Sequence, residues 1–170
     1  GTLPRIADEV AALGCKRAFV LSDPHHATAA AARLMDALGK LGVQLSTDAV
    51  MHTPTDVTDR VMAKLVATNA DCLVALGGGS TIGLGKALAL RTNLPQIVLP
   101  TTYAGSELTP MLGETSGGEK TTRSGPEILP DTVIYDVQLT TTLPWSVTLP
   151  SAINAMAHAV EALYSKDADD

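Results

Sequence analysis

One stretch decides the fold: Leu73-Val74-Ala75-Leu76-Gly77-Gly78-Gly79-Ser80-Thr81-Ile82-Gly83-Leu84-Gly85-Lys86. An aliphatic run stops at three glycines, and a helical pattern begins at Ser80, so the stretch predicts a strand, a tight turn and a helix. Glycines without a Cβ let the backbone approach a ligand closely, and the first N–H groups of the helix point at that ligand. The arrangement favours a phosphate or a pyrophosphate.

The glycine pattern does not match either of the common nucleotide motifs. The dinucleotide fingerprint G-x-G-x-x-G fails because Ile82 stands where its third glycine should be, and Gly83 comes one residue late. The mononucleotide loop G-x-x-x-x-G-K-[ST] fails because Ser80 occupies its first glycine, and Ala87 follows Lys86 where a magnesium-binding hydroxyl is needed. The stretch therefore predicts phosphate binding without choosing the nucleotide. A glycine turn that only packs strand against helix is the alternative.

Composition narrows the class of protein and its partners. The 170 residues are 45% hydrophobic and 18% charged, which permits a sizeable core in one domain. The net charge is −6 and no basic run is present, so we expect neither a nucleic-acid partner nor a membrane partner. Cys15 and Cys72 lie in no metal or redox spacing, which favours two buried thiols of a cytoplasmic protein.

Strands and helices alternate along most of the chain. This order predicts βαβ units and an α/β fold with a mainly parallel sheet. Both ends look cut, so we expect a piece of a longer polypeptide. The predicted strands cover residues 17–21, 43–51, 72–76, 96–99 and 128–135; the predicted helices cover 2–13, 28–41, 53–69, 80–90 and 149–164; a β-hairpin is predicted within 109–123.

Polar residues follow the predicted strands, where open α/β sheets bind ligands. Three segments should converge there, namely Asp23, the 77–80 loop and the 101–107 loop. Asp23 can accept hydrogen bonds from ribose hydroxyls, or it can simply form the turn before Pro24. The hydroxyls of the 101–107 loop, on Thr101, Thr102 and Ser106, can hold ribose or phosphate oxygens, or they can belong to a solvated turn.

Three further polar residues are candidates for chemistry. Lys120 can neutralise a phosphate, although a lone lysine on a hairpin is commonly just solvated. Asn154 and His158 are four residues apart and so share one face of a helix, a spacing used for metal ligands. The neutral amide of Asn154 is a poor ligand for zinc or ferrous iron, so a structural or hydrogen-bonded His158 is the alternative.

Several of these motifs together resemble the iron-containing alcohol dehydrogenase family. They are Gly77-Gly78-Gly79-Ser80, Pro100-Thr101-Thr102 with Gly105-Ser106-Glu107, and the segment from Asn154 to Glu161. The resemblance covers essentially the whole chain. It implies a Rossmann-like three-layer domain over residues 1–145, followed over 146–170 by the first helix of a helical catalytic domain. It also implies that NADH or NADPH binds through Gly77, Gly78, Gly79, Ser80, Thr101, Thr102, Ser106, Lys120, Leu139 and Leu143.

Two departures separate the chain from the metal-dependent members of that family. Those members carry an aspartate where Asn154 stands, and usually one where Gly83 stands. The segments Gly113-Glu114-Thr115 and Lys120-Thr121-Thr122 instead resemble a reductase branch that works without metal. The activity implied by that branch is the reduction of maleylacetate to 3-oxoadipate, in the breakdown of aromatic compounds.

We therefore expect hydride transfer from the nicotinamide to the conjugated C=C bond of a keto-diacid, with no metal ion. His158 is the first candidate for the proton donor and Tyr103 the second. Asp23 favours NADH or dual use, and a homodimer is the expected assembly. The isolated fragment is expected to be inactive. The alternatives are a metal-dependent (Fe or Zn) alcohol or polyol dehydrogenase and a non-catalytic nucleotide-binding module.

Overall fold

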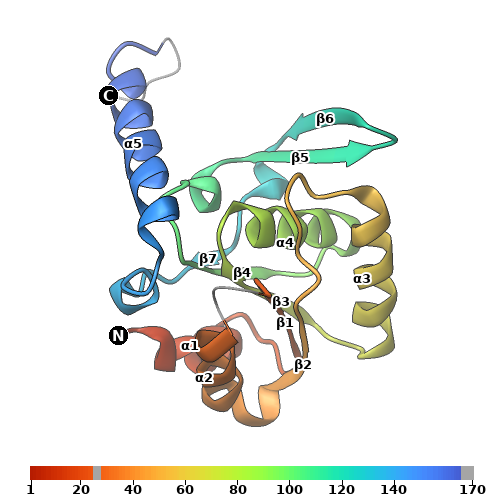
Figure 1. Cartoon of the computed structure of the whole chain (residues 1–170). Coiled ribbons are helices and arrows are strands. Elements are labelled where there is room, and N and C mark those ends of the chain that lie inside the picture. The colour runs from red at the N-terminus through yellow and green to blue at the C-terminus, as the bar shows by residue number, and fades with distance from the viewer. Residues whose placement is uncertain (25–27, 166–170) are drawn as a thin grey trace.

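The central sheet consists of parallel strands in the order β2-β1-β3-β4-β7 (Figure 1). The computed structural model describes residues 1–24 and 28–165. The order of the strands reverses between β1 and β3, and ligands of open α/β sheets bind beyond such a reversal. The strands are β1 (Ala18–Ser22), β2 (Gly42–Ser46), β3 (Cys72–Gly77), β4 (Gln96–Pro100) and β7 (Thr132–Val133).

Helices cover both faces of the sheet, as Figure 1 shows. The alternation within β1 explains why, because Ala18 and Val20 pack with the α1 and α2 side while Phe19 and Leu21 pack with the α3 and α4 side. All four side chains are fully buried. The predicted three-layer α/β fold is confirmed. The helices are α1 (Ile6–Ala12), α2 (Thr28–Leu38), α3 (Thr55–Ala67) and α4 (Gly79–Thr92).

The predicted hairpin is confirmed and lies beside α4 (Figure 1). Strands β5 (Met111–Ser116) and β6 (Glu119–Ser124) pair in antiparallel register. Gly117 and Gly118 connect them with φ of 57° and 86°, and the type I′ hairpin turn requires positive φ at both of its central positions. Buried Leu112 packs against Ala87 of α4, so the hairpin is attached to the helix that follows the glycine loop.

Two predicted strands are longer than the observed ones. The strand predicted over 43–51 ends at Ser46, and the chain then turns through His52 and Thr53, whose φ values are 68° and 44°. The strand predicted over 128–135 is reduced to β7, which begins only at Thr132 because Ile128 belongs to a 3₁₀ turn and Pro130 has no N–H to donate. Single 3₁₀ turns connect several elements: η1 (Leu3–Arg5), η2 (Gly39–Leu41), η3 (Ser106–Leu108), η4 (Pro126–Ile128) and η5 (Val137–Leu139).

Helix α5 (Trp145–Ala162) begins four residues before its predicted start and stands away from the sheet (Figure 1). Pro150 lies inside its second turn, where a proline removes one helical hydrogen bond. No α5 residue is buried. No helix in the described ranges is both long and apolar enough to cross a membrane. The boundary between residues 1–145 and 146–170 remains a prediction, and residues 166–170 lie outside the described ones.

Candidate nucleotide-binding site

The glycine loop is shaped by the loop that follows β4. Gly78 precedes α4 in an extended conformation, and a Cβ at this position would lie 2.9 Å from Cγ2 of Thr102. A Cβ at Gly79 would lie 3.3 Å from Oγ of Ser106. The backbone N–H of Thr101 donates to the carbonyl of Gly77 at 3.0 Å. The predicted convergence of the 77–80 and 101–107 loops is therefore confirmed, and side chains are excluded from the glycine loop by close approach.

A cleft of about 440 Å³ opens beside the first turn of α4. Four of the predicted cofactor residues line it together, namely Gly79, Ser80, Ser106 and Lys120. The unpaired N–H groups of a helix N-terminus carry partial positive charge, and the Lys120 ammonium adds a full one, so the cleft favours an anion. The remaining residues of this glycine-loop cleft are Met51, His52, Thr53, Gly83, Lys86, Thr109, Met111, Leu112, Gly113 and Thr122.

The other predicted cofactor residues do not line this cleft. Asp23 directly follows Ser22, which pairs with Leu76, so Asp23 lies at the same sheet edge as the glycine loop. Leu139 is buried in the core that the sheet forms with α1 and α2. Leu143 is half-buried in the turn before α5. A role for Asp23, Leu139 and Leu143 in binding the cofactor remains a prediction.

Several cleft residues were not predicted from the sequence. His52 is exposed and lines the cleft next to buried Thr53. A Cβ added to Gly83 would lie 2.6 Å from Oγ1 of Thr53, so Gly83 leaves the space that Thr53 occupies. The positive φ values that turn residues 52 and 53 inward have no signal in the sequence, because β-branched threonine rarely adopts them.

Lys86 also lines the cleft, yet its side chain is only 2% exposed. Its Nζ lies 2.6 Å from the carbonyl oxygens of both Ser106 and Thr109. Burial lowers the pKa of Lys86 to about 8, and the nearby charge of Glu107 opposes that shift. The sequence contained this lysine next to the glycine pattern, but only the fold shows what it contacts.

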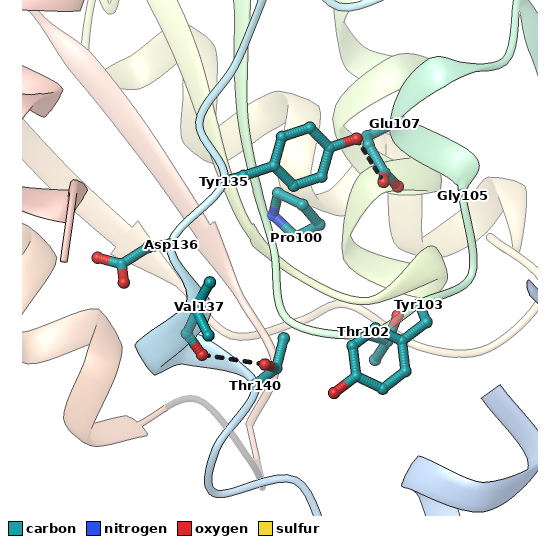
Figure 2. Close-up of a pocket in the computed structure, with 9 residues that line it drawn as sticks. All are labelled: Pro100, Thr102, Tyr103, Gly105, Glu107, Tyr135, Asp136, Val137 and Thr140. Atoms are coloured by element: carbon teal, nitrogen blue, oxygen red, sulfur yellow. Dashed lines mark hydrogen bonds between the residues drawn. The ribbon is translucent and has the colours of Figure 1, made fainter. Parts of the chain in front are cut away.

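A second cavity, the Tyr135 pocket, lies beyond β4 and has a volume of about 340 Å³ (Figure 2). Tyr135 and Glu107 point toward one another there, and the phenol donates to Oε1 of Glu107 at 3.0 Å. Burial and this hydrogen bond raise the pKa of Tyr135 to about 12. Tyr103, 38% exposed, lines the Tyr135 pocket and not the glycine-loop cleft. Its backbone N–H donates to Oγ of Ser151 at 2.9 Å, which connects this loop to α5.

The two candidate residues on α5 are both exposed. Asn154 and His158 lie one helical turn apart, as predicted, and offer one neutral amide and one imidazole. This pair does not fit a tightly held ferrous or zinc ion, because such sites use carboxylate, imidazole or thiolate ligands.

The two cysteines are free and buried, as predicted, but the fold brings them together although their spacing suggested no such site. Their sulfur atoms and a carboxylate oxygen of Asp71 all lie within 4.8 Å of one another. Burial raises the pKa of both thiols. The Asp71 carboxylate accepts backbone N–H groups of Lys16 and Arg17 at 2.8–3.1 Å. Because Lys16 and Arg17 precede β1 and Asp71 precedes β3, these hydrogen bonds join the starts of the two strands.

The parallel sheet, the glycine loop and the cleft at the carboxyl edge define a Rossmann-like α/β domain. The model of the family "Iron-containing alcohol dehydrogenase" matches residues 1–137. The chain belongs to the iron-containing alcohol dehydrogenase family. It is 56% identical over 170 residues to a maleylacetate reductase of Rhizobium sp. (strain MTP-10005). The alignment covers 98% of this chain and 47% of that relative.

Solved structures show the same fold. The crystal structure of maleylacetate reductase from Agrobacterium tumefaciens superimposes with a TM-score of 0.94 at 53% identity, over 99% of this chain and 48% of that one. A sulfoacetaldehyde reductase from Bifidobacterium kashiwanohense, solved in complex with NAD⁺, gives a TM-score of 0.91 at 25% identity, over 98% of this chain and 50% of that one. The chain spans about half the length of the relatives that it matches.

Proposed function

We propose that the full-length protein is an oxidoreductase that reduces maleylacetate to 3-oxoadipate with NADH or NADPH. The observation that carries the proposal is the glycine-loop cleft, where Ser80 and Lys120 face one space at a helix N-terminus. Maleylacetate is proposed as the substrate because the similar enzymes are maleylacetate reductases. We also propose that the protein acts in the cytoplasm, as a homodimer, in the breakdown of aromatic compounds.

In this proposal the cleft binds the diphosphate of the nucleotide. The backbone N–H groups of Gly79 and Ser80 donate to its oxygens, and the Lys120 ammonium neutralises part of its charge. Asp23, at the same sheet edge, accepts hydrogen bonds from the ribose hydroxyls. A carboxylate in this place repels a 2′-phosphate, so NADH is the favoured coenzyme and NADPH the second.

The reaction we propose is hydride transfer from the nicotinamide to the conjugated C=C bond of a keto-diacid. The enolate charge that develops must be met by hydrogen-bond donors, and a general acid must then deliver a proton to carbon. His158 is the proposed proton donor and Tyr103 the second candidate. In the full-length enzyme, His158→Ala should lower kcat sharply while the Kd for NADH stays unchanged. Unchanged turnover would exclude this role.

We propose that no metal ion takes part, because Asn154 supplies a neutral amide where a carboxylate would favour a divalent cation. The rival is a metal-dependent alcohol or polyol dehydrogenase, as the family name suggests. The test is an assay of the full-length enzyme on maleylacetate with each coenzyme, with and without a chelator, alongside a metal analysis. Activity that survives chelation supports the proposal. Stoichiometric iron or zinc with chelator-sensitive turnover would support the rival.

A further inference from the structure

Lys86 lies two turns into α4 and is almost completely buried, at 2% exposure. No carboxylate in the described part of the chain forms an ion pair with it within 4.0 Å. Burying an ammonium without a counter-ion is costly unless hydrogen bonds compensate it. The site must therefore supply that compensation in another form.

The compensation comes from backbone carbonyls of a single segment. Nζ lies 2.6 Å from the carbonyl of Ser106, 2.6 Å from that of Thr109 and 3.1 Å from that of Met111. An ammonium has three hydrogens to donate, so these three carbonyls use all of them. Oγ1 of Thr109 is a fourth oxygen near the ammonium, 3.2 Å from Nζ. Lys86 thus clamps residues 106–111 onto α4.

This segment connects two walls of the glycine-loop cleft. At one end, Ser106 lies against Gly79, where a Cβ would be 3.3 Å from its Oγ. At the other end, Met111 is the first residue of the hairpin that carries Lys120. The floor of the cleft is the first turn of α4 itself. One ammonium on α4 therefore sets where both walls stand relative to the floor.

A lysine after a glycine loop could instead bind a phosphate directly. The geometry opposes that role for Lys86, because its donors are already taken by carbonyls and its side chain is closed to solvent. Lys120 is exposed and lines the same cleft, so it is the lysine that can reach a phosphate.

We propose that Lys86 is a positioning residue for the coenzyme: by holding the carbonyls of residues 106–111 on α4, it fixes the distance between the glycine loop and the wall that carries Lys120. The inference rests on the proposed function only for the identity of the ligand. The clamp itself is a property of the fold and can be measured without any nucleotide.

The first experiment compares Lys86→Met with wild type in the full-length protein, using Lys40→Met as the matched control, because Lys40 is an exposed lysine of η2. Hydrogen–deuterium exchange should quicken at least tenfold in peptides spanning residues 101–112, and stay unchanged in β1 and β3. The Kd for NADH, from fluorescence titration, should rise at least tenfold. Lys40→Met should match wild type in both measurements.

The second experiment needs no destabilised variant. Because the pKa of Lys86 is about 8, raising the pH from 7 to 9.5 removes its charge and one of its donors, so the wild-type Kd for NADH should rise several-fold above pH 8. The charged or titratable groups nearby are Glu107 beside Lys86, and His52 and Lys120 in the cleft. In Lys86→Arg the guanidinium stays charged over this pH range, so the Kd of that variant should not rise above pH 8. Lys120→Met should weaken NADH binding at every pH but should keep the rise in Kd above pH 8.

A folded Lys86→Met protein with wild-type exchange over residues 101–112 would overturn the clamp. A folded Lys86→Met protein that binds NADH as tightly as wild type would overturn its role in positioning the coenzyme. Failure of the wild-type protein to bind NADH at any pH would instead contradict the proposed function, and the exchange experiment would still decide whether Lys86 holds the segment.

Discussion

Gly78 shows at the scale of one residue why the loop before α4 must be glycine. Its φ of −88° is open to any residue, so the reason is not the backbone conformation. The reason is space, because a Cβ would lie 2.9 Å from Cγ2 and 3.2 Å from Oγ1 of Thr102. A side chain at this position would push the 101–107 loop away from the N–H groups that line the cleft.

Gly78→Ala should therefore weaken NADH binding about tenfold, equivalent to roughly 1.4 kcal/mol. The protein should remain folded, because the strained contact is with a side chain in a loop. Fluorescence titration of the full-length protein measures the Kd. Gly125→Ala is the matched control, since its Cβ would meet only the exposed end of Glu127. Equal NADH affinity for Gly78→Ala and wild type would show that the Thr102 contact does not matter.

Asp48 connects the loop that carries His52 and Thr53 to helix α3. It accepts hydrogen bonds from Lys64, at 2.7 Å, and from Ser46, and these bonds hold its pKa below the usual value. A lowered pKa means that the carboxylate stabilises the fold above pH 4, and that this contribution is lost as the pH falls through the lowered value.

Asp48→Asn should cost about 0.2–1 kcal/mol of unfolding free energy at pH 7, because the pair is partly exposed. Urea titrations at pH 7 and pH 3 should show the difference from wild type shrinking at the lower pH. If the difference in unfolding free energy between Asp48→Asn and wild type grew at pH 3, the Asp48 carboxylate would not be the group that stabilises the fold at pH 7.

At the scale of elements, the hairpin is held on α4 by a second cation besides Lys86. Nη2 of Arg91 lies 2.8 Å from Oε1 of Glu114, and the Glu114 side chain is only 7% exposed. Removing the arginine would leave a buried carboxylate without its partner, which costs more than the pair contributes.

Arg91→Met should lower the unfolding free energy by about 1–3 kcal/mol. Adding Glu114→Leu to that variant should recover most of the loss, because two apolar side chains can replace a buried ion pair. Urea unfolding of the single and double variants tests this. Should the double variant be no more stable than Arg91→Met, the ion pair would not explain how the hairpin is attached.

The alternation of strand and helix patterns, together with the glycines that end them, was enough to predict the order of the elements. The buried runs 72–76 and 96–99 coincide with β3 and β4 almost to the residue, because both strands are covered on both faces and read as continuous apolar segments. The same criterion overextended β7, since an apolar run from Ile128 looks like a strand even where Pro130 interrupts the hydrogen bonding.

The candidate site could be predicted only where residues adjoin a motif. Ser80 and Ser106 lie in the segments that follow β3 and β4, so their meeting at the sheet edge could be inferred. The roles of Thr53 and Lys86 could not be predicted. The place of Thr53 depends on positive φ values, and that of Lys86 on carbonyls twenty or more residues away. Such tertiary contacts leave no periodicity in the sequence.

At the scale of the whole molecule, α5 carries an apolar surface that nothing in the described chain covers. Its large side chains are 55–82% exposed: Trp145, Leu149, Ile153, Met156 and Val160. Exposed apolar patches of this kind mark surfaces for further protein contacts. His158 lies on the same helix, so the proposed catalytic face is incomplete in a chain that spans about half of its relatives.

The 170-residue chain alone should therefore bind NADH without reducing maleylacetate, whereas the full-length enzyme should do both. Parallel fluorescence titrations and absorbance assays on the two proteins measure this. Turnover by the short chain would show that the residues needed for chemistry are all present in it.

The most direct test of the account is a crystal structure of the full-length protein with NADH. We predict the diphosphate within hydrogen-bonding distance of the backbone N–H groups of Gly79 and Ser80, with the Lys120 ammonium beside it and the amide of Asn154 free of any metal ion. A diphosphate bound elsewhere, or a cation coordinated by Asn154, would contradict the account.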